Sequence, residues 1–288
     1  MSINTIVAPM TGGPTDGAAL DAALAMAGPT NAHIHAIFLH PDPKRVAIPQ
    51  VGEGMTAAMI DTLIEAAEQR IQSDRGQAQA SYDSWRKAND IVEADTPGPR
   101  DSVTAQLGVV QGEPNNSLAK IGRTADVVCM TQPSDNDDPE LANLVTTALM
   151  DTGKLLFLAP NGGKCAPVKS VAVAWNGSRE AARAVALAMP MLERADLVTV
   201  LAGTSDMLTP AEVNAFVDSL KWHGVNAKPR MFTMNGDQAG RLQAEAMDAG
   251  AQVLVLGAYS HSRMREFVFG GVTDDILNAA QMPVLLAH

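Results

Sequence analysis

The residues of this sequence that are best suited to ligand chemistry lie near its C-terminal end, where glycines follow an apolar run. Gly257 ends the run VLVLG at 253–257, and Gly270 and Gly271 precede a helical pattern at 272–280. Glycines at such positions let backbone N–H groups approach a phosphate, and a helix N-terminus adds favourable dipole charge. This pattern favours an anion or nucleotide site, although glycine at a strand end or a helix start is also ordinary turn chemistry.

Positive charge within this loop contrasts with the acidity of the whole chain. His261, Arg263 and Arg265 lie between the glycines, whereas 21 Lys and Arg against 32 Asp and Glu give a net charge of −11. So acidic a surface repels phosphate backbones and anionic lipid, and we find no Lys/Arg run that offsets it. The N-terminus lacks a signal-peptide pattern, and no apolar segment reaches the roughly 20 residues of a membrane span. We therefore expect a cytoplasmic protein with no nucleic-acid or membrane partner.

Candidate metal ligands and catalytic groups are scattered along the chain. Cys129 and Cys165 are too few for a disulfide scaffold or a four-thiolate zinc site. His33 and His35 flank Ile34 at the start of a strand, with no thiol or carboxylate at ligand spacing, which favours a structural or surface role. No P-loop, GxSxG or HExxH motif is present, and we can assemble no nucleophile with its base. The sequence therefore predicts neither catalytic residues nor a metal site.

The elements that must position the glycine loop occur twice along the chain. INTIVAPM at 3–10 matches VKSVAVAW at 168–175, ADVVCMT at 125–131 matches AQVLVLG at 251–257, and KLLFLAP at 154–160 matches MPVLLAH at 282–288. Ordered matches of this kind indicate a tandem repeat. The segment NGGKCAP at 161–167 breaks regular structure with its glycines and its proline. We therefore expect two domains, residues 1–160 and residues 168–288.

Each repeat has the pattern of alternating strands and helices. In the back repeat we expect strands at 169–174, 196–202, 229–233, 252–257 and 283–287, with helices between them. Continuous apolar runs suit strands buried on both faces, and the intervening helices make the connections parallel and right-handed. Ser178 is the expected N-cap of a helix at 178–192. The front repeat adds a long helical pattern at 55–88, which we expect to cover a sheet face or a partner subunit.

A ligand in an open α/β sheet lies outside the carboxyl ends of the strands, so the loops after the first and fourth strands are the candidate sites. In the front repeat Thr131 stands where Gly257 would be, and the next loop carries the four acids Asp135, Asp137, Asp138 and Glu140. Four carboxylates repel a triphosphate unless a cation intervenes. A solvated acidic loop that caps the next helix is the ordinary explanation, and a Mg²⁺ or Ca²⁺ site is the alternative. We expect no phosphate ligand in the front repeat.

At these residues the sequence resembles the universal stress protein family. The family signature is Gly, two residues, Gly, nine residues, Gly and then Ser or Thr, and the domain closes with a Pro-Val-Leu strand. Gly257 and Gly270 match the first and third glycines, and PVL at 283–285 matches the closing strand. Ser260 replaces the second glycine, and Gly271 replaces the Ser or Thr, for which Thr273 is a substitute. The family's first-strand Asp-Gly-Ser is NGS at 176–178, so an amide replaces the expected carboxylate.

The resemblance implies an α/β fold with two doubly wound, Rossmann-like domains of the adenine nucleotide alpha hydrolase type, each with a parallel five-stranded sheet. Family members pair through the final strand, which implies an intrachain pseudo-dimer through 154–159 and 284–287, and a homodimer of the whole chain is plausible. The implied function is a stress-response binding or sensing module; the alternatives are a ligand-free interaction scaffold and, less favoured, a nucleotide-hydrolysing enzyme. The implied ligand is ATP or another adenine nucleotide, with Mg²⁺. Its implied contacts are Asn176, Gly177, Ser178, Gly257, Ser260, His261, Arg263, Gly270, Gly271 and Thr273.

Overall fold

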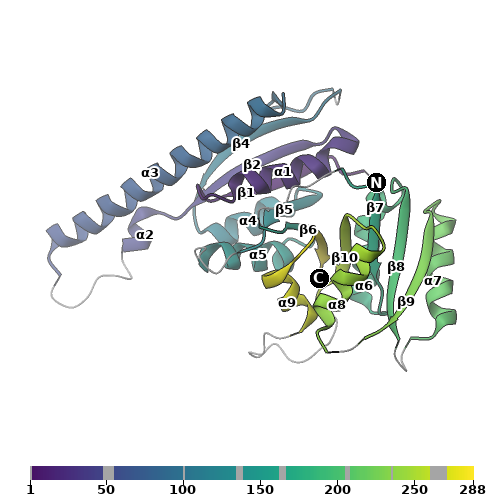
Figure 1. Cartoon of the computed structure of the whole chain (residues 1–288). Coiled ribbons are helices and arrows are strands. Elements are labelled where there is room, and N and C mark those ends of the chain that lie inside the picture. The colour runs from purple at the N-terminus through teal and green to yellow at the C-terminus, as the bar shows by residue number, and fades with distance from the viewer. Residues whose placement is uncertain are drawn as a thin grey trace.

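The computed structural model describes residues 2–47, 55–99, 101–133, 139–161, 167–204, 208–234, 236–259 and 271–288. Figure 1 shows two α/β units joined side by side, with one long helix reaching out from the front unit. No helix among the described residues is long and apolar enough to cross a membrane.

The front unit contains six strands and five α-helices among its described residues. Its elements are β1 (Thr5–Met10), α1 (Asp16–Ala27), a 3-10 turn (Gly28–Thr30), β2 (His33–His40), α2 (Pro43–Ala47), α3 (Ala57–Ala88), β3 (Val92–Glu93), β4 (Thr104–Gln111), α4 (Pro114–Gly122), β5 (Val127–Thr131), α5 (Pro139–Asp151) and β6 (Leu155–Ala159). We expected five strands, and the two-residue strand β3 beside β4 is the addition.

The back unit contains the five strands expected from its apolar runs, each within two residues of the expected ends. Its elements are β7 (Ser170–Ala174), α6 (Arg179–Leu192), β8 (Leu197–Thr204), α7 (Pro210–Trp222), β9 (Ala227–Thr233), α8 (Gln238–Asp248), β10 (Val253–Gly257), α9 (Val272–Ala279) and β11 (Val284–Ala287). Ser178 is the N-cap of α6, and its side chain accepts a hydrogen bond from the backbone N–H of Ala181.

The eleven strands of the described residues form one sheet, in the order β3-β4-β2-β1-β5-β6-β11-β10-β7-β8-β9. Numbered within each unit and with β3 set aside, both units have the order 3-2-1-4-5, and every pair of neighbours except β6 and β11 is parallel. The fold class expected from the sequence is therefore confirmed, with the two sheets hydrogen-bonded into one. We propose residues 1–160 and 168–288 as the two domains.

The pairing of β6 with β11 has the register that a two-fold axis requires. Phe157 faces Leu285, and these two residues are equivalent in the alignment of the repeats. On either side, Leu158 faces Val284 and Leu156 faces Leu286, so each unit contributes the same positions in opposite directions. All of these side chains are buried. The expected pairing through the final strands therefore occurs within the chain.

The core is aliphatic and lies on both faces of the sheet, as the low aromatic content of 4% predicts. The C-terminal part of α3 covers one face of the front unit, where Ala78, Tyr82 and Trp85 are buried. Its N-terminal part extends beyond the unit (Figure 1), and Met59 in that part is 50% exposed. The helix expected at 55–88 is thus present, but only part of its length is buried against the sheet.

Candidate nucleotide site

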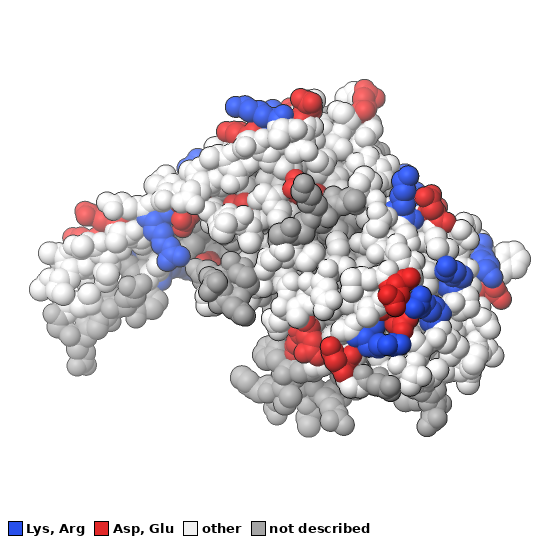
Figure 2. Space-filling view, in the orientation of Figure 1, with Lys and Arg blue, Asp and Glu red and all other residues white. Residues whose placement is uncertain are grey.

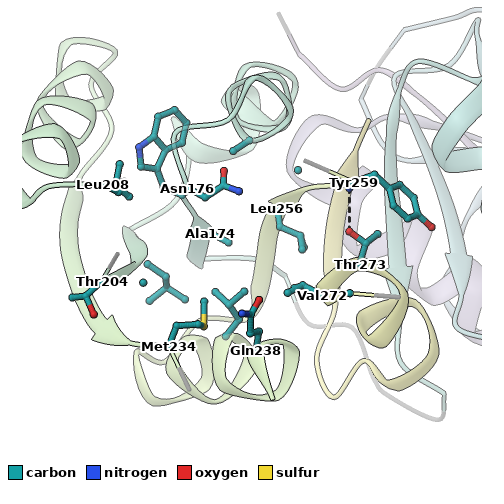
Figure 3. Close-up of a pocket in the computed structure, with 17 residues that line it drawn as sticks. Ala174, Asn176, Thr204, Leu208, Met234, Gln238, Leu256, Tyr259, Val272 and Thr273 are labelled. Atoms are coloured by element: carbon teal, nitrogen blue, oxygen red, sulfur yellow. Dashed lines mark hydrogen bonds between the residues drawn. The ribbon is translucent and has the colours of Figure 1, made fainter. Parts of the chain in front are cut away.

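A cavity of about 410 Å³ lies in the back unit at the carboxyl ends of β7, β8 and β10. This is the edge at which open α/β sheets place ligands. Residues from well-separated segments meet there, as Figure 3 shows. The cavity is lined by Ala174, Trp175, Asn176, Ala181, Leu201, Gly203, Thr204, Leu208, Met234, Gln238, Leu242, Leu256, Gly257, Tyr259, Gly271, Val272 and Thr273.

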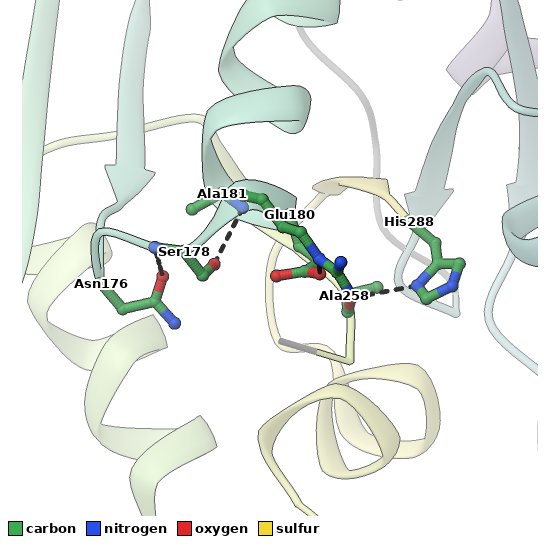
Figure 4. A network of polar contacts seen from close by, with 7 residues as sticks. Asn176, Ser178, Glu180, Ala181, Ala258 and His288 are labelled. Carbon is green, nitrogen blue, oxygen red and sulfur yellow. Dashed lines mark hydrogen bonds and ion pairs between the residues drawn. The ribbon is translucent and has the colours of Figure 1, made fainter. Parts of the chain in front are cut away.

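The turn between β7 and α6 is held by side chains that the sequence marked as ligand contacts (Figure 4). Oδ1 of Asn176 accepts a hydrogen bond from the backbone N–H of Ser178 at 3.1 Å, and Oγ of Ser178 accepts one from Ala181 at 3.1 Å. Gly177 permits the turn because its φ is +74°. Asn176 lines the cavity, whereas Gly177 and Ser178 are not among its lining residues and build the turn.

The sequence position of Gly257 suggested the approach of a phosphate, but the structure shows that close backbone packing requires glycine there. A Cβ at Gly257 would overlap the backbone carbon of Glu180 and the backbone nitrogen of Ala181. The end of β10 therefore packs directly against the first turn of α6, and any side chain would force the two elements apart. Gly257 also lines the cavity, so this close packing helps to set the cavity wall.

The start of α9 supplies the opposite wall. Gly271 is its N-cap, with φ +129°, and a Cβ there would meet no atom of the described residues within 4 Å. Thr273 is buried, and its Oγ1 accepts a hydrogen bond from the backbone N–H of Tyr259 at 3.1 Å. The Tyr259 hydroxyl donates to Oδ1 of Asp274 at 2.8 Å. Burial, together with this bond, raises the pKa of Tyr259.

Charged side chains of the described residues lie near the cavity but do not line it. No side chain that carries a full charge at neutral pH is among the described lining residues. Asp274 and Asp275 lie in the first turn of α9, and Arg179 pairs with Glu180 at 2.6 Å in the first turn of α6. The hydrogen bond from Arg179 lowers the pKa of Glu180. Figure 2 shows acidic and basic side chains interspersed over the drawn face of the back unit, with no continuous basic patch among the residues drawn there in colour.

Four of the ten expected contacts line the cavity: Asn176, Gly257, Gly271 and Thr273. The expected contacts Ser260, His261, Arg263 and Gly270 lie outside the described residues, as do Arg265 and the acids Asp135, Asp137 and Asp138 of the front loop. Over the ranges that the structure does describe, no group of three or more His, Cys, Asp or Glu is placed to hold a metal ion. Nδ1 of His33 lies 2.9 Å from Oγ1 of Thr104 on the neighbouring strand.

Several lining residues were not identified from the sequence. Gly203 and Thr204 end β8, Met234 follows β9, and Trp175 follows β7. These residues share one feature, since each lies at or next to the carboxyl end of a strand. Treating the carboxyl end of every strand as a candidate site would have identified them. Leu208 lies just before α7 and Gln238 is the first residue of α8, and neither carries a sequence pattern of its own.

Comparisons with known proteins agree with this fold. The model of the universal stress protein family matches residues 167–288. No curated protein matches the chain. A universal stress protein from Archaeoglobus fulgidus matches with a TM-score of 0.66 at 13% identity, covering 99% of this chain and 96% of that one. A putative universal stress protein from Pseudomonas aeruginosa matches with a TM-score of 0.54 at 13% identity, covering 99% and 93%.

The family match and the structural matches cover different extents of the chain. The family model covers the back unit, which contains the cavity, whereas the solved structures cover both units and share the fold. Residues 167–288 thus match the universal stress protein family, and the chain as a whole shares its tandem fold with solved universal stress proteins.

Proposed function

We propose that the back unit binds an adenine nucleotide in the cavity and that the protein acts as a binding or sensing module of a stress response. The observation that supports this most directly is the convergence of Asn176, Gly257, Gly271 and Thr273 on one cavity of about 410 Å³. These residues come from three segments of the chain, and the resemblance to the family selected each of them for nucleotide binding.

The proposed position of the phosphates is the start of α9. No atom of the described residues fills the space where a Cβ of Gly271 would stand, so a phosphate can approach the backbone N–H groups of the first turn. The Thr273 hydroxyl accepts the N–H of Tyr259 and keeps its own proton for donation. Thr273 can therefore anchor the loop and donate to a phosphate oxygen at the same time.

The charge around this position favours a nucleotide that carries a divalent cation. Asp274 and Asp275 repel phosphate from the same helix turn that attracts it. Mg²⁺ bound to the phosphates would reduce this repulsion, and it would arrive with the nucleotide. His261 and Arg263 remain proposed contacts of the phosphates.

We propose binding without turnover because the described lining lacks the groups that hydrolysis would use. It contains no His, Cys, Lys, Asp or Glu side chain. Tyr259 has a hydroxyl, but its raised pKa and its hydrogen bond to Asp274 keep it protonated. In a multiple-turnover assay we expect no ATP hydrolysis above background, and sustained hydrolysis that needs Thr273 or Tyr259 would contradict this part of the proposal.

The proposal is tested by calorimetric titration with MgATP of the wild type, Gly271→Val and Gly224→Val. Gly224 is the matched control, because it also has a positive φ, of +77°, with open space around it, and lies at the end of α7 outside the cavity lining. We expect one site per chain in the wild type and in Gly224→Val, and loss of binding in Gly271→Val. Binding that survives Gly271→Val unchanged would contradict the site, and a wild type that binds no nucleotide would favour the interaction scaffold.

A further inference from the structure

The cavity lining combines apolar and polar side chains. Figure 3 shows Met234 beside Thr204 and Gln238, and Val272 beside Thr273. The Met234 side chain lies over Gly203, where its Cε would be 3.2 Å from an added Cβ. Leu208 is buried and lies 3.6 Å from the position of a Cβ on Gly177. A ligand that fills the cavity therefore meets both apolar and polar groups.

Trp175 lines the same cavity and stacks on a second aromatic ring. Its indole lies flat against the ring of Phe216 on α7, with ring centroids 3.6 Å apart and planes 5° apart. Its backbone N–H donates to Leu201 at 2.8 Å, which extends the hydrogen bonding of β7 to β8 by one residue. Phe216 covers one face of the indole and does not line the cavity. The surface of Trp175 that remains is available to a ligand without loss of side-chain freedom.

We propose that Trp175, backed by Phe216, is the wall against which the planar ring of the ligand packs, while the polar part of the ligand reaches Gly271. Trp175 is then a specificity-determining residue that selects ligands with a planar aromatic ring. This inference rests on the proposed function and assigns the ring of the nucleotide to one side of the cavity. Contact between a base and an aromatic side chain makes about a tenfold difference in affinity or more.

The test uses tryptophan fluorescence in a Trp222→Phe background. Trp222 is 91% exposed at the end of α7, and Trp85 is buried in the front unit, so Trp175 becomes the ligand-sensitive fluorophore. We expect adenosine and MgATP each to change its emission in a saturable way, with the affinities that calorimetry gives. With Trp175→Leu, the emission change disappears and calorimetry shows about tenfold weaker binding of both ligands.

Two variants separate ring contact from general packing. Phe216→Leu removes an aromatic ring from the same stack without changing the cavity lining, and we expect its affinity for MgATP to stay within about threefold of the wild type. Trp175→Phe keeps a ring at the wall and should bind better than Trp175→Leu. Melting curves show whether each variant is folded, and if Trp175→Leu does not fold, the emission titration and Trp175→Phe carry the test.

The outcomes distinguish this inference from the proposed function. MgATP binding that leaves Trp175 emission and the Trp175→Leu affinity unchanged would overturn the inference and leave the proposed function intact. Equal losses in Phe216→Leu and Trp175→Leu would also overturn it, because they would indicate general damage to packing. If neither adenosine nor MgATP binds the wild type, both proposals fail.

Discussion

At the carboxyl ends of the equivalent strands β1 and β7, the two units make different turns. After β7, Asn176 and Ser178 bond to backbone N–H groups close by, and the turn leaves a cavity beside it. Five residues separate β1 from α1, against four between β7 and α6, and the buried carboxylate of Asp16 accepts the N–H groups of Thr11 and Gly12, both at 2.9 Å. Burial raises the pKa of Asp16. The backbone N–H groups of Thr11 and Gly12 in this turn are therefore already bonded.

The helices that follow the second strands also differ. In the front unit α3 has 32 residues, and a Cβ at Gly12 would overlap the backbone of Asp74 within it. In the back unit α7 has 13 residues, and its start lies near the open cavity. Two units with one strand order thus differ at the ligand edge because of loop length and helix length. Strand order alone does not determine the form of the ligand edge in a unit of this fold.

The largest effect is expected at the pair of strands β6 and β11, which joins the two units. Leu285→Asp and Phe157→Asp each place a charge at a fully buried position of the β6–β11 pair. We expect each to cost more than about 4 kcal/mol or to cause aggregation, because an unpaired buried charge is strongly destabilising. Thermal melting and size-exclusion chromatography measure this. Val109→Asp on β4, where Val109 is 40% exposed, is the control and should stay folded.

A substitution in the β6–β11 pair that affects the two units unequally would contradict this expectation. If Leu285→Asp unfolds only the back unit while the front unit melts as in the wild type, the two units do not depend on a shared sheet. Hydrogen exchange read separately for strands of each unit would show this.

The next prediction concerns Gly257, whose equivalent in the front unit is Thr131. Gly257→Ala should destabilise the protein by about 2–3 kcal/mol, because its Cβ overlaps the backbone at the start of α6. Gly76→Ala in α3, where a Cβ meets nothing within 4 Å, is the control and should stabilise by about 0.5–1 kcal/mol. Chemical denaturation measures both. A Gly257→Ala protein of wild-type stability would show that the close packing is not present in solution.

A smaller effect concerns the cation. Because Asp274 and Asp275 lie at the proposed phosphate position, removal of Mg²⁺ with EDTA should weaken ATP binding several-fold and AMP binding less. Asp275→Asn should reduce this dependence on Mg²⁺. Calorimetric titrations with and without EDTA provide the measurement. ATP affinity that is unchanged by EDTA would show that other groups neutralise the phosphates.

Much of the fold could be predicted from the sequence, and less of the site. The apolar run VLVLG and the cap at Ser178 determine local structure through burial and hydrogen bonding of nearby residues. The role of Gly257 could not be predicted, because it depends on how closely a helix 77 residues earlier, at Glu180, approaches it. The stacking of Trp175 on Phe216 could not be predicted for the same reason, since Phe216 comes from a separate helix.

The smallest expected effect is a difference between the two units in how their stability depends on pH. Burial lowers the pKa of His33 and of His35, and the charge of His33 lowers that of His35 further. The unfolded chain, with histidine pKa values near 6.5, then binds more protons than the folded chain, so stability falls as the pH is lowered through about 6.5. The strands of the back unit contain no histidine. Hydrogen exchange at pH 7.5 and 5.5 should show weakened protection mainly in β2 and β4, and His33→Gln with His35→Gln should remove the difference.

The claim that a nucleotide binds only the back unit is tested most directly by photoaffinity labelling with 8-azido-ATP and Mg²⁺, followed by mass spectrometry of the labelled peptides. We expect a single labelled region that contains Trp175, Leu208 or Met234, and competition by unlabelled ATP should abolish the label. Label that competes with ATP but lies in the front unit, beside Thr11 to Asp16 or Thr131, would contradict it.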